Sequence, residues 1–373
     1  MKVLTGFIMD GKSGGIDKYL LNVLEQVSGN NLSKIQGPIT LDFLTNEVDP
    51  DLEEKLATYG SKIYAIPNLK HPKGQYDRVR KILEEGGYDA VYFNISTAID
   101  LIAAKAAKDA GIKRRMIHSH SSGNDCESSL KRFVFDSIHK TCKHFLYRYG
   151  NEFYGCSIKA GDWLFPRKIV NSDNFKVIHN AVDRKKFSYD PEEREKIRQE
   201  LGCSPDDYIY GHVGNFCYQK NHYFLLEIFD KIHKIQPEAK LWLVGDGPRF
   251  QEVNRRVKEM GLEDSVKLLG RRSDANALYQ GMDAFLLPSN FEGLPIAGIE
   301  AQSAGLPCYM SDTITKESKI TQSCYFLSLK KKPDYWAKKI VENKKKRTCA
   351  HYLAGAQAYD LERQTQEIWN LFN

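Results

Sequence analysis

Two glutamates eight residues apart are the pair in this sequence whose spacing points most directly to binding chemistry. Glu292 and Glu300 lie in the segment LLPSNFEGLPIAGIEAQSAGLP, which spans 286–307. The segment predicts a strand, a polar turn, and a helix with Pro295 in its first turn, where a missing N–H has no consequence. The N–H groups at such a helix end attract anions, and carboxylates accept hydrogen bonds from hydroxyl groups. The pair therefore suits a sugar joined to a nucleoside diphosphate, while the competing interpretation is a surface helix with two solvated glutamates.

A second candidate lies near the N-terminus, where GFIMDGKS over 6–13 matches the phosphate-binding pattern G-x-x-x-x-G-K-[ST]. Such a loop would use Gly11, Lys12 and Ser13 and would make the chain a nucleotide hydrolase. The pattern needs its variable residues in an open loop, whereas Phe7–Met9 are expected to end a buried strand. A helix should also begin at Lys12 or Ser13, yet two more glycines follow directly. The hydrolase is therefore kept only as an alternative.

Short apolar runs alternate with helical patterns along most of the chain, which predicts parallel sheets covered by helices. The expected strands are 2–8, 39–44, 62–66, 90–95, 115–118, 153–156, 176–178, 208–213, 240–244, 266–269, 284–287, 308–310 and 324–327. The charged stretch 183–200 suits a linker and a surface helix between two such series. We therefore predict two α/β domains, 1–183 and 184–353, with a terminal helix over 354–373 that packs back on the first.

Bulk properties narrow the function further. A length of 373 residues is enough for two domains. The net charge of +6 is too small to indicate nucleic acid, and it fits an anionic substrate or an anionic membrane surface. No stretch reaches about 18 apolar residues, and Met1–Met9 lacks the features of a signal peptide, so we expect a cytoplasmic protein. The eight cysteines form no C-x-x-C pair, which favours reduced thiols over zinc or redox sites.

These segments together resemble the signatures of retaining GT-B glycosyltransferases of the large GT4 family, in order along nearly the whole chain. The E-x7-E signature is formed by Glu292 and Glu300. The other matching segments are GGI at 14–16, HSH at 118–120, VIHNAVD at 177–183, GNFCYQKN at 214–221, GDGP at 245–248 and LLPS at 286–289. The resemblance implies two Rossmann-like, doubly wound domains facing a central cleft. It also implies transfer of a sugar, most simply from a UDP-sugar, to a glycan or lipid-linked glycan in bacterial capsule, exopolysaccharide or cell-wall synthesis.

The resemblance assigns roles to individual residues. Lys220 would stabilise the charge on the leaving diphosphate, unless it is an ordinary solvated loop lysine. Glu300 would bind the ribose hydroxyls and Glu292 the sugar. His118 would lie against the donor sugar and His120 near the acceptor, unless they only end a strand. The other expected donor-binding residues are Gly14, Gly15, Gly214, Arg271, Leu294, Pro295 and Ile296, of which Pro295 offers no N–H.

One residue departs from the family pattern G-R-x-x-x-x-K-N, because Asn215 stands in the arginine position. An amide can donate to a phosphate oxygen but brings neither the charge nor the forked geometry of a guanidinium. The site could be weakened, Arg271 or Arg272 could compensate, or the substitution could trap a complex. We recognise no metal triad, so we expect neither a metal nor a cofactor, with Lys220 and helix dipoles in place of a divalent ion.

The stretch 128–148 combines apolar and basic residues at helical spacing. Its apolar members are Leu130, Phe133, Val134, Ile138, Phe145 and Leu146, and its basic members are Lys131, Arg132, Lys140, Lys143 and Arg148. Such a helix either packs on its own sheet or rests on anionic lipid at the inner face of the membrane. A non-catalytic GT-B partner subunit and a sugar-nucleotide epimerase of similar architecture are further alternatives.

Overall fold

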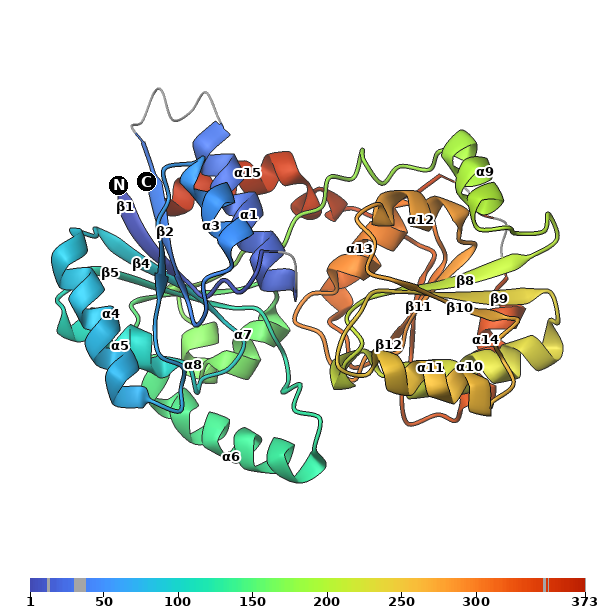
Figure 1. The fold of residues 1–373 in the computed structure, drawn as a ribbon, viewed down its shortest axis with the longest axis horizontal. Helices are drawn as coiled ribbons and strands as arrows, with labels where there is room; N and C mark the ends of the chain where they lie inside the picture. Colours follow the sequence, from blue (N-terminus) through green and yellow to red (C-terminus); the bar gives the residue numbers. More distant parts are fainter. Residues whose placement is uncertain (12–13, 30–37, 345–346, 348, 373) are drawn as a thin grey trace. The chain divides into compact units, whose positions relative to one another are not determined.

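The chain forms two α/β units, each built on its own parallel sheet (Figure 1). The computed structural model describes residues 1–11, 14–29, 38–344, 347 and 349–372. The first unit comprises Met1–Asn124, Ser128–Asn180 and Glu362–Asn373, and the second comprises Asp125–Glu127 and Ala181–Leu361. The boundary therefore falls after Asn180 rather than after residue 183, and residues 354–361 stay with the second unit.

A seven-stranded sheet in the order β3-β2-β1-β4-β5-β6-β7 is the centre of the first unit. Its strands are β1 (Lys2–Gly6), β2 (Thr40–Thr45), β3 (Ile63–Ala65), β4 (Ala90–Ile95), β5 (Arg114–Ser119), β6 (Glu152–Gly155) and β7 (Phe175–Val177). Its helices are α1 (Gly14–Gly29), α3 (Pro50–Ala57), α4 (Pro72–Gly86), α5 (Leu101–Asp109), α6 (Ser129–Leu146), α7 (Ile158–Leu164), α8 (Arg167–Val170) and the terminal α15 (Leu361–Phe372). Helices α1, α3 and α15 cover one face of this sheet, and α4, α5 and α7 cover the other (Figure 1).

The second unit has a six-stranded sheet in the order β10-β9-β8-β11-β12-β13. Its strands are β8 (Tyr208–Val213), β9 (Ala239–Val244), β10 (Val266–Gly270), β11 (Ala284–Leu287), β12 (Cys308–Ser311) and β13 (Cys324–Leu327). Its helices are α9 (Pro191–Glu200), α10 (His222–Ile235), α11 (Phe250–Glu259), α12 (Ala275–Gly281), α13 (Ile296–Ser303) and α14 (Pro333–Glu342). The strand order reverses between β8 and β11, and such switch points are where doubly wound sheets bind ligands.

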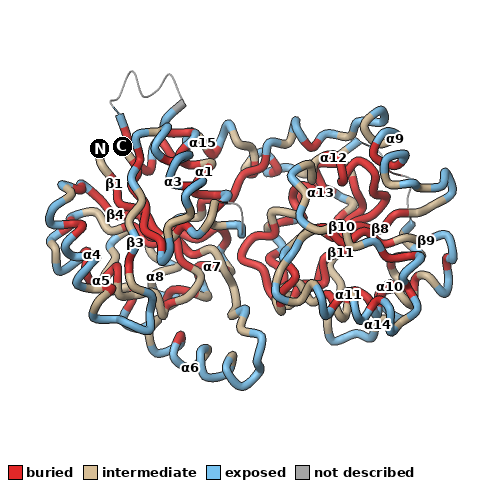
Figure 2. The backbone as a smooth tube through the Cα atoms, in the orientation of Figure 1, coloured by how far each residue is buried: buried red, intermediate tan, exposed pale blue. Residues whose placement is uncertain are grey.

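Every strand predicted from the sequence is present, with ends shifted by two residues at most. The buried strands are near-continuous apolar runs because helices cover both faces of a parallel sheet, and Figure 2 shows the burial concentrated in the strands. The prediction for β1 was wrong at its end. The strand stops at Gly6, and Phe7–Met9 lie in a loop.

The terminal helix α15 joins the core of the first unit. Ile368, Trp369 and Phe372 are buried in the same cluster as the apolar side chains of β1 and α1. Gln364 adds two hydrogen bonds, since its amide donates to the carbonyl of His179 and accepts from Gln26. The chain thus leaves the first unit at residue 180 and returns to it with its last helix.

Candidate functional site

Lys220 and Glu292 form an ion pair at the carboxyl edge of the second sheet. Lys220 lies in the loop after β8, Glu292 lies in the turn between β11 and α13, and β8 and β11 are neighbours at the switch point. The Nζ–Oε1 distance is 2.7 Å, and the two side chains are 14% and 5% exposed. Glu292 also accepts hydrogen bonds from Gln219 Nε2 at 2.9 Å and Ser289 Oγ at 2.8 Å. The interpretation of Lys220 and Glu292 as solvated surface groups is therefore wrong.

The electrostatics of this pair keep the ammonium charged. Burial alone lowers the pKa of Lys220, but the charge of Glu292 and the hydrogen bond to it outweigh that effect, so the pKa stays above its usual value. A cation at the end of a buried parallel strand can bind phosphate without taking up a proton. The site thus holds a permanent positive charge beside a carboxylate.

Glu300 is buried on the first turns of α13. It is 4% exposed and accepts a hydrogen bond from the hydroxyl of Tyr279 at 3.0 Å. Burial, followed by the charge of Glu300, raises the pKa of Tyr279 well above its usual range, so this hydroxyl remains a donor. Helix α13 begins at Ile296, and Pro295 is its N-cap. The sequence had predicted Pro295 in the first turn, which begins one position later. Both members of the glutamate pair are therefore built into the second unit.

Glycines allow two loops to meet at the same edge. Gly245 and Gly247 follow β9 with φ of +134° and +152°, a conformation that favours glycine. A Cβ on Gly245 would lie 2.0 Å from the carbonyl oxygen of Gly214, and a Cβ on Gly247 would lie 2.5 Å from Oδ1 of Asn215. A Cβ on Gly214 would in turn lie 2.9 Å from Cε of Lys220. The predicted residues Gly214, Asn215 and Lys220 therefore pack together, and the β9 loop supports them.

The arginines near this edge already have partners. Arg272 donates to Asp274 and to Glu200, so its guanidinium is directed to two carboxylates. Arg271 is exposed directly after β10. Arg249, which the sequence reasoning missed, pairs with Glu127 and lies over the ring of Tyr218. The signal that could have found it is its place directly after the GDGP segment.

Two acidic residues reach the loop before Lys220. Glu127 accepts from the N–H of Tyr218 at 2.9 Å, and Asp125 accepts from the N–H of Gln219 at 2.6 Å. Burial raises the pKa of Asp125. These main-chain donors therefore already bind carboxylate oxygens, which shows that this loop can bind an anion. Nothing in the spacing of the sequence indicated the contact.

In the first unit, His118 and His120 lie in a buried cluster of rings. His118 lies within β5 rather than at its end, its Nδ1 is 2.5 Å from the hydroxyl of Tyr92, and its ring is 4.1 Å from that of His120. Nε2 of His120 is 2.8 Å from Oδ1 of Asn94. Burial lowers the pKa of His118, with a further contribution from His120, and burial lowers the pKa of His120 to about 3. Both rings are neutral, so they can supply hydrogen bonds but not positive charge.

The glycine loop after β1 is not arranged as a P-loop. The carboxylate of Asp17 is buried and accepts from the N–H groups of Met9, Asp10 and Gly11 at 2.9–3.1 Å. A P-loop directs such N–H groups at phosphate. Lys12 and Ser13 lie outside the described residues, and α1 begins directly at Gly14 and Gly15. A pocket of about 470 Å³ lies beside this loop, lined by residues 7–10 and 45–50.

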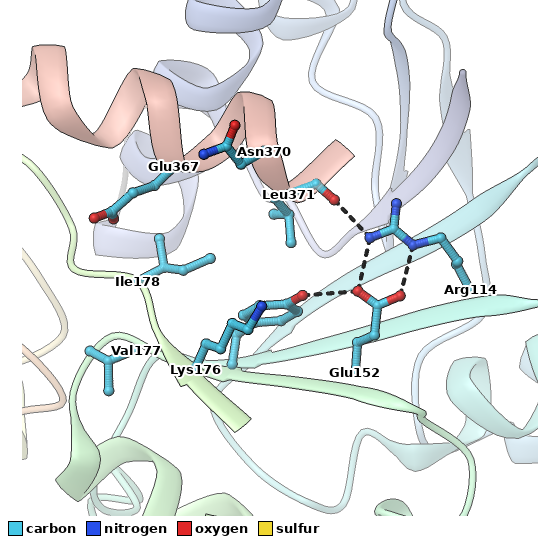
Figure 3. Close-up of a pocket in the computed structure, with 9 residues that line it drawn as sticks. Arg114, Glu152, Lys176, Val177, Ile178, Glu367, Asn370 and Leu371 are labelled. Atoms are coloured by element: carbon cyan, nitrogen blue, oxygen red, sulfur yellow. Dashed lines mark hydrogen bonds and ion pairs between the residues drawn. The ribbon is translucent and has the colours of Figure 1, made fainter. Parts of the chain in front are cut away.

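A second pocket, of about 440 Å³, lies under the terminal helix of the first unit (Figure 3). Arg114 makes two hydrogen bonds to Glu152, at 2.7 and 2.8 Å, and also donates to the carbonyl of Leu371. Tyr154 donates to the same carboxylate at 2.9 Å. Arg114 and Glu152 begin their strands, so this pocket lies at the amino edge of the sheet. Through its hydrogen bonds to Leu371 and Glu152, Arg114 links α15 to strands β5 and β6.

Within the residues that the structure describes, no three His, Cys, Asp or Glu side chains gather as metal ligands. Independence from metal stays a prediction. In the same part of the chain, no helix combines the length and the apolarity needed to cross a bilayer.

Comparison with known proteins shows which enzymes this chain is similar to. Residues 193–349 match the family model described as glycosyl transferases group 1. EpsF of Bacillus subtilis, assigned by name to the glycosyltransferases, is 27% identical and aligns over 96% of this chain and 93% of its own. The UDP-Gal:alpha-D-GlcNAc-diphosphoundecaprenol alpha-1,3-galactosyltransferase of Escherichia coli is 27% identical over 77% of this chain and 72% of its own.

A solved structure agrees with the fold. That of HepE from Anabaena, in complex with UDP and glucose, matches with a TM-score of 0.75 at 18% identity, covering 100% of this chain and 99% of that one. Residues 193–349 are therefore similar to the group 1 glycosyltransferases, and the chain has the GT-B fold that the sequence predicted. The nucleotide-hydrolase alternative finds no support in these comparisons.

Proposed function

We propose that this glycosyltransferase takes a sugar from a UDP-sugar, with retention of anomeric configuration, and gives it to a glycan or lipid-linked glycan during synthesis of a bacterial surface polysaccharide. The observation that carries the proposal is the buried Lys220–Glu292 pair at the switch point of the second sheet. The comparisons support the choice of substrates. The name of the Escherichia coli relative includes UDP-Gal and a diphosphoundecaprenol-linked acceptor, and HepE was solved with UDP and glucose.

Lys220 is proposed to act on the leaving group. Negative charge grows on the diphosphate as the glycosidic bond breaks, and a fixed cation aimed at it lowers the barrier. Because the pKa of Lys220 is already raised, the ammonium needs no proton before it binds phosphate. The charge of Lys220 is proposed to replace a divalent metal ion, which makes the reaction metal-independent.

Glu292 and Glu300 are proposed to bind hydroxyl groups of the donor. When Lys220 binds phosphate, Glu292 can accept hydrogen bonds from the sugar while Gln219 and Ser289 keep its carboxylate in place. Glu300, oriented by Tyr279, accepts from the ribose. The base is placed beside Arg271, after β10, and the phosphates are placed against the N–H groups at 294–296, apart from that of Pro295.

The first unit is proposed to bind the acceptor. The pocket beside the glycine loop has the polar side chains Thr45, Asn46 and Glu47, which suit sugar hydroxyls. His118, Gly14 and Gly15 remain predictions for contacts to the donor, and His120 remains one for the acceptor. A lipid-linked acceptor would bring the enzyme from the cytoplasm to the inner face of the membrane.

A panel of nucleotide sugars tests the donor. A ligand that binds only the folded state raises apparent stability in proportion to its occupancy, so the preferred UDP-sugar should raise the melting temperature more than ADP- and GDP-sugars do. UDP release in the presence of chelator then tests metal independence, and the NMR coupling constant of the new anomeric proton tests retention. Donor binding without transfer to any acceptor would instead favour a non-catalytic subunit.

A further inference from the structure

One buried carboxylate holds the loop that follows β1. Asp17 lies in the first turn of α1 and is 1% exposed. Its Oδ2 accepts hydrogen bonds from the N–H groups of Met9 at 3.1 Å, Asp10 at 3.0 Å and Gly11 at 2.9 Å. Successive N–H groups that converge in this way form an anion site, and here the anion is a side chain of the same unit. Burial raises the pKa of Asp17, while the three N–H groups act in the opposite direction.

Every main-chain N–H of this loop, residues 7–11, has an acceptor. The first two N–H groups donate to main-chain carbonyls of β4 and β2, the two strands that pair with β1. The last three donate to Asp17. The start of the loop is therefore fixed by the sheet itself, and its end is fixed by a single side chain.

The same loop helps to form the pocket of about 470 Å³ at the carboxyl edge of the first sheet. Residues 7–10 line it together with residues 45–50, which follow β2 and lead into α3. Helices α1 and α3 lie side by side over this part of the sheet (Figure 1). Gly11 packs on α3, since a Cβ at this position, with φ of +65°, would lie 2.8 Å from Cδ1 of Leu52. The shape of the pocket thus depends on where Asp17 holds the loop.

We propose that Asp17 is a positioning residue for the acceptor, whose carboxylate holds Met9 and Asp10 in the path that shapes this pocket. At 1% exposure Asp17 has no surface to offer a sugar, so it acts through the loop. The inference rests on the proposed function for the identity of the pocket. It adds the residue that gives the pocket its shape. It also gives the N–H groups of the GFIMDGKS segment an internal partner in place of an external phosphate.

Amide hydrogen exchange of the full chain, without donor or acceptor, measures the loop directly. In Asp17→Asn an NH2 group replaces one carboxylate oxygen, and it faces the main-chain N–H groups instead of accepting from them. Exchange at Met9, Asp10 and Gly11 should become about tenfold faster or more, because hydrogen bonds to a charged acceptor are the strong ones. Exchange in β4 and β5 should not change. The matched control is Glu25→Gln, which removes a half-exposed carboxylate from the same helix and should leave the three amides unchanged.

Steady-state kinetics test the link between the loop and the acceptor. Asp17→Asn should raise KM for the acceptor by about tenfold or more, while kcat and the dissociation constant of the UDP-sugar stay within about twofold. Gly11→Ala disturbs the same loop from the side of Leu52 without removing a charge, so it should raise the same KM. A purely structural role would lower the melting temperature without this split between KM and kcat.

Three results would overturn the proposal. The first is exchange at the three amides that is as fast in the wild type as in an unstructured chain, and this measurement needs no variant. The second is unchanged exchange in a folded Asp17→Asn protein. The third is an unchanged KM for the acceptor in both Asp17→Asn and Gly11→Ala. A wild-type protein that releases no UDP from any UDP-sugar would count against the proposed reaction instead, because the exchange measurement needs no substrate.

Discussion

Replacing Lys220 by Met separates the structural role of its ion pair from its proposed role on the leaving group. The substitution keeps most of the aliphatic chain and removes the charge. The carboxylate of Glu292, 5% exposed, then keeps the neutral donors of Gln219 and Ser289. Removing one partner of a buried ion pair costs about 3–5 kcal/mol, and the remaining donors place this case near the lower end. For a domain of this size about 3 kcal/mol lowers the melting temperature of the second unit by roughly 6–12 °C.

An exposed pair of the same length provides the control. Lys234 Nζ lies 2.7 Å from Asp230 Oδ2 in α10, but the Lys234 side chain is 64% exposed. Lys234→Met should cost about 0.3–0.5 kcal/mol. The double variant Lys220→Met with Glu292→Gln should recover most of the lost stability, because no unpaired charge stays buried. Calorimetry on the wild type, Lys220→Met, Glu292→Gln and the double variant gives the coupling between Lys220 and Glu292, and Lys234→Met is measured beside them as the control.

Kinetics on the same proteins measure the chemical role. By analogy with the removal of one oxyanion donor, Lys220→Met should lower kcat about 10²–10³-fold. The double variant should stay slow although its stability returns. The reasoning is refuted if Lys220→Met is no less stable than Lys234→Met. If its stability falls but UDP release at saturating donor is unchanged, Lys220 is not the cation on the leaving group.

Four further predictions follow from the same contacts. Glu300→Gln should weaken binding of the UDP-sugar by roughly 1.5–3 kcal/mol, measured by calorimetric titration, because a charged acceptor is lost. Asn215→Arg should raise UDP release at least tenfold, about 1.4 kcal/mol, if a missing cation limits the rate; an arginine variant that is folded but no faster would contradict this. Gly245→Ala should lower the melting temperature far more than Gly261→Ala, where a Cβ meets no atom within 4 Å. The free energy of unfolding should fall as the pH is lowered from about 6.5 toward about 3, because burial depresses the pKa of His120 and keeps its ring neutral in the fold. The expected loss is about 1.4 kcal/mol per pH unit for each such group. Denaturant unfolding of His120→Asn should show a shallower dependence on pH.

The strands could be predicted because burial on both faces of a parallel sheet leaves near-continuous apolar runs. The end of β1 shows where that signal fails. Ile8 is 1% exposed, yet it lies in the loop after the strand. Apolar composition reports burial rather than strand geometry, so an apolar loop residue extends a predicted strand. The same limit led the prediction to place Phe7–Met9 in β1.

The site residues could be predicted singly but not as a set. Lys220 and Glu292 lie 72 positions apart, and their contact depends on β8 and β11 being neighbours. The order of strands in a sheet cannot be obtained from the periodicity of apolar residues. For that reason the sequence did not predict that Gln219 and Ser289 hold Glu292, or that Tyr279 holds Glu300. Helix α6 gives the same lesson, because an apolar helical face looks the same in the sequence whether it packs inward or faces solvent. Of the six apolar residues predicted to form the face of α6, Leu146 alone is buried, so the interpretation in which this face packs on its own sheet is wrong.

Because Asn215 is neutral where the family pattern has an arginine, the positions of the other cations in the second unit decide which of them can supply the missing charge. Arg272 is held by Asp274 and Glu200, and releasing it would break contacts to two carboxylates. Arg249 is held by Glu127, and its N–H donates to the carbonyl of Phe216, inside the 214–221 loop. Arg249 is therefore tied to the loop that carries Lys220, whereas Arg272 is tied to α9 through Glu200. An anion that displaced Glu127 would find a guanidinium already in place, which favours Arg249 over Arg272 as the compensating cation. An inactive Arg249→Gln protein that Asn215→Arg restores would support this compensation, and one that retains full activity would exclude it.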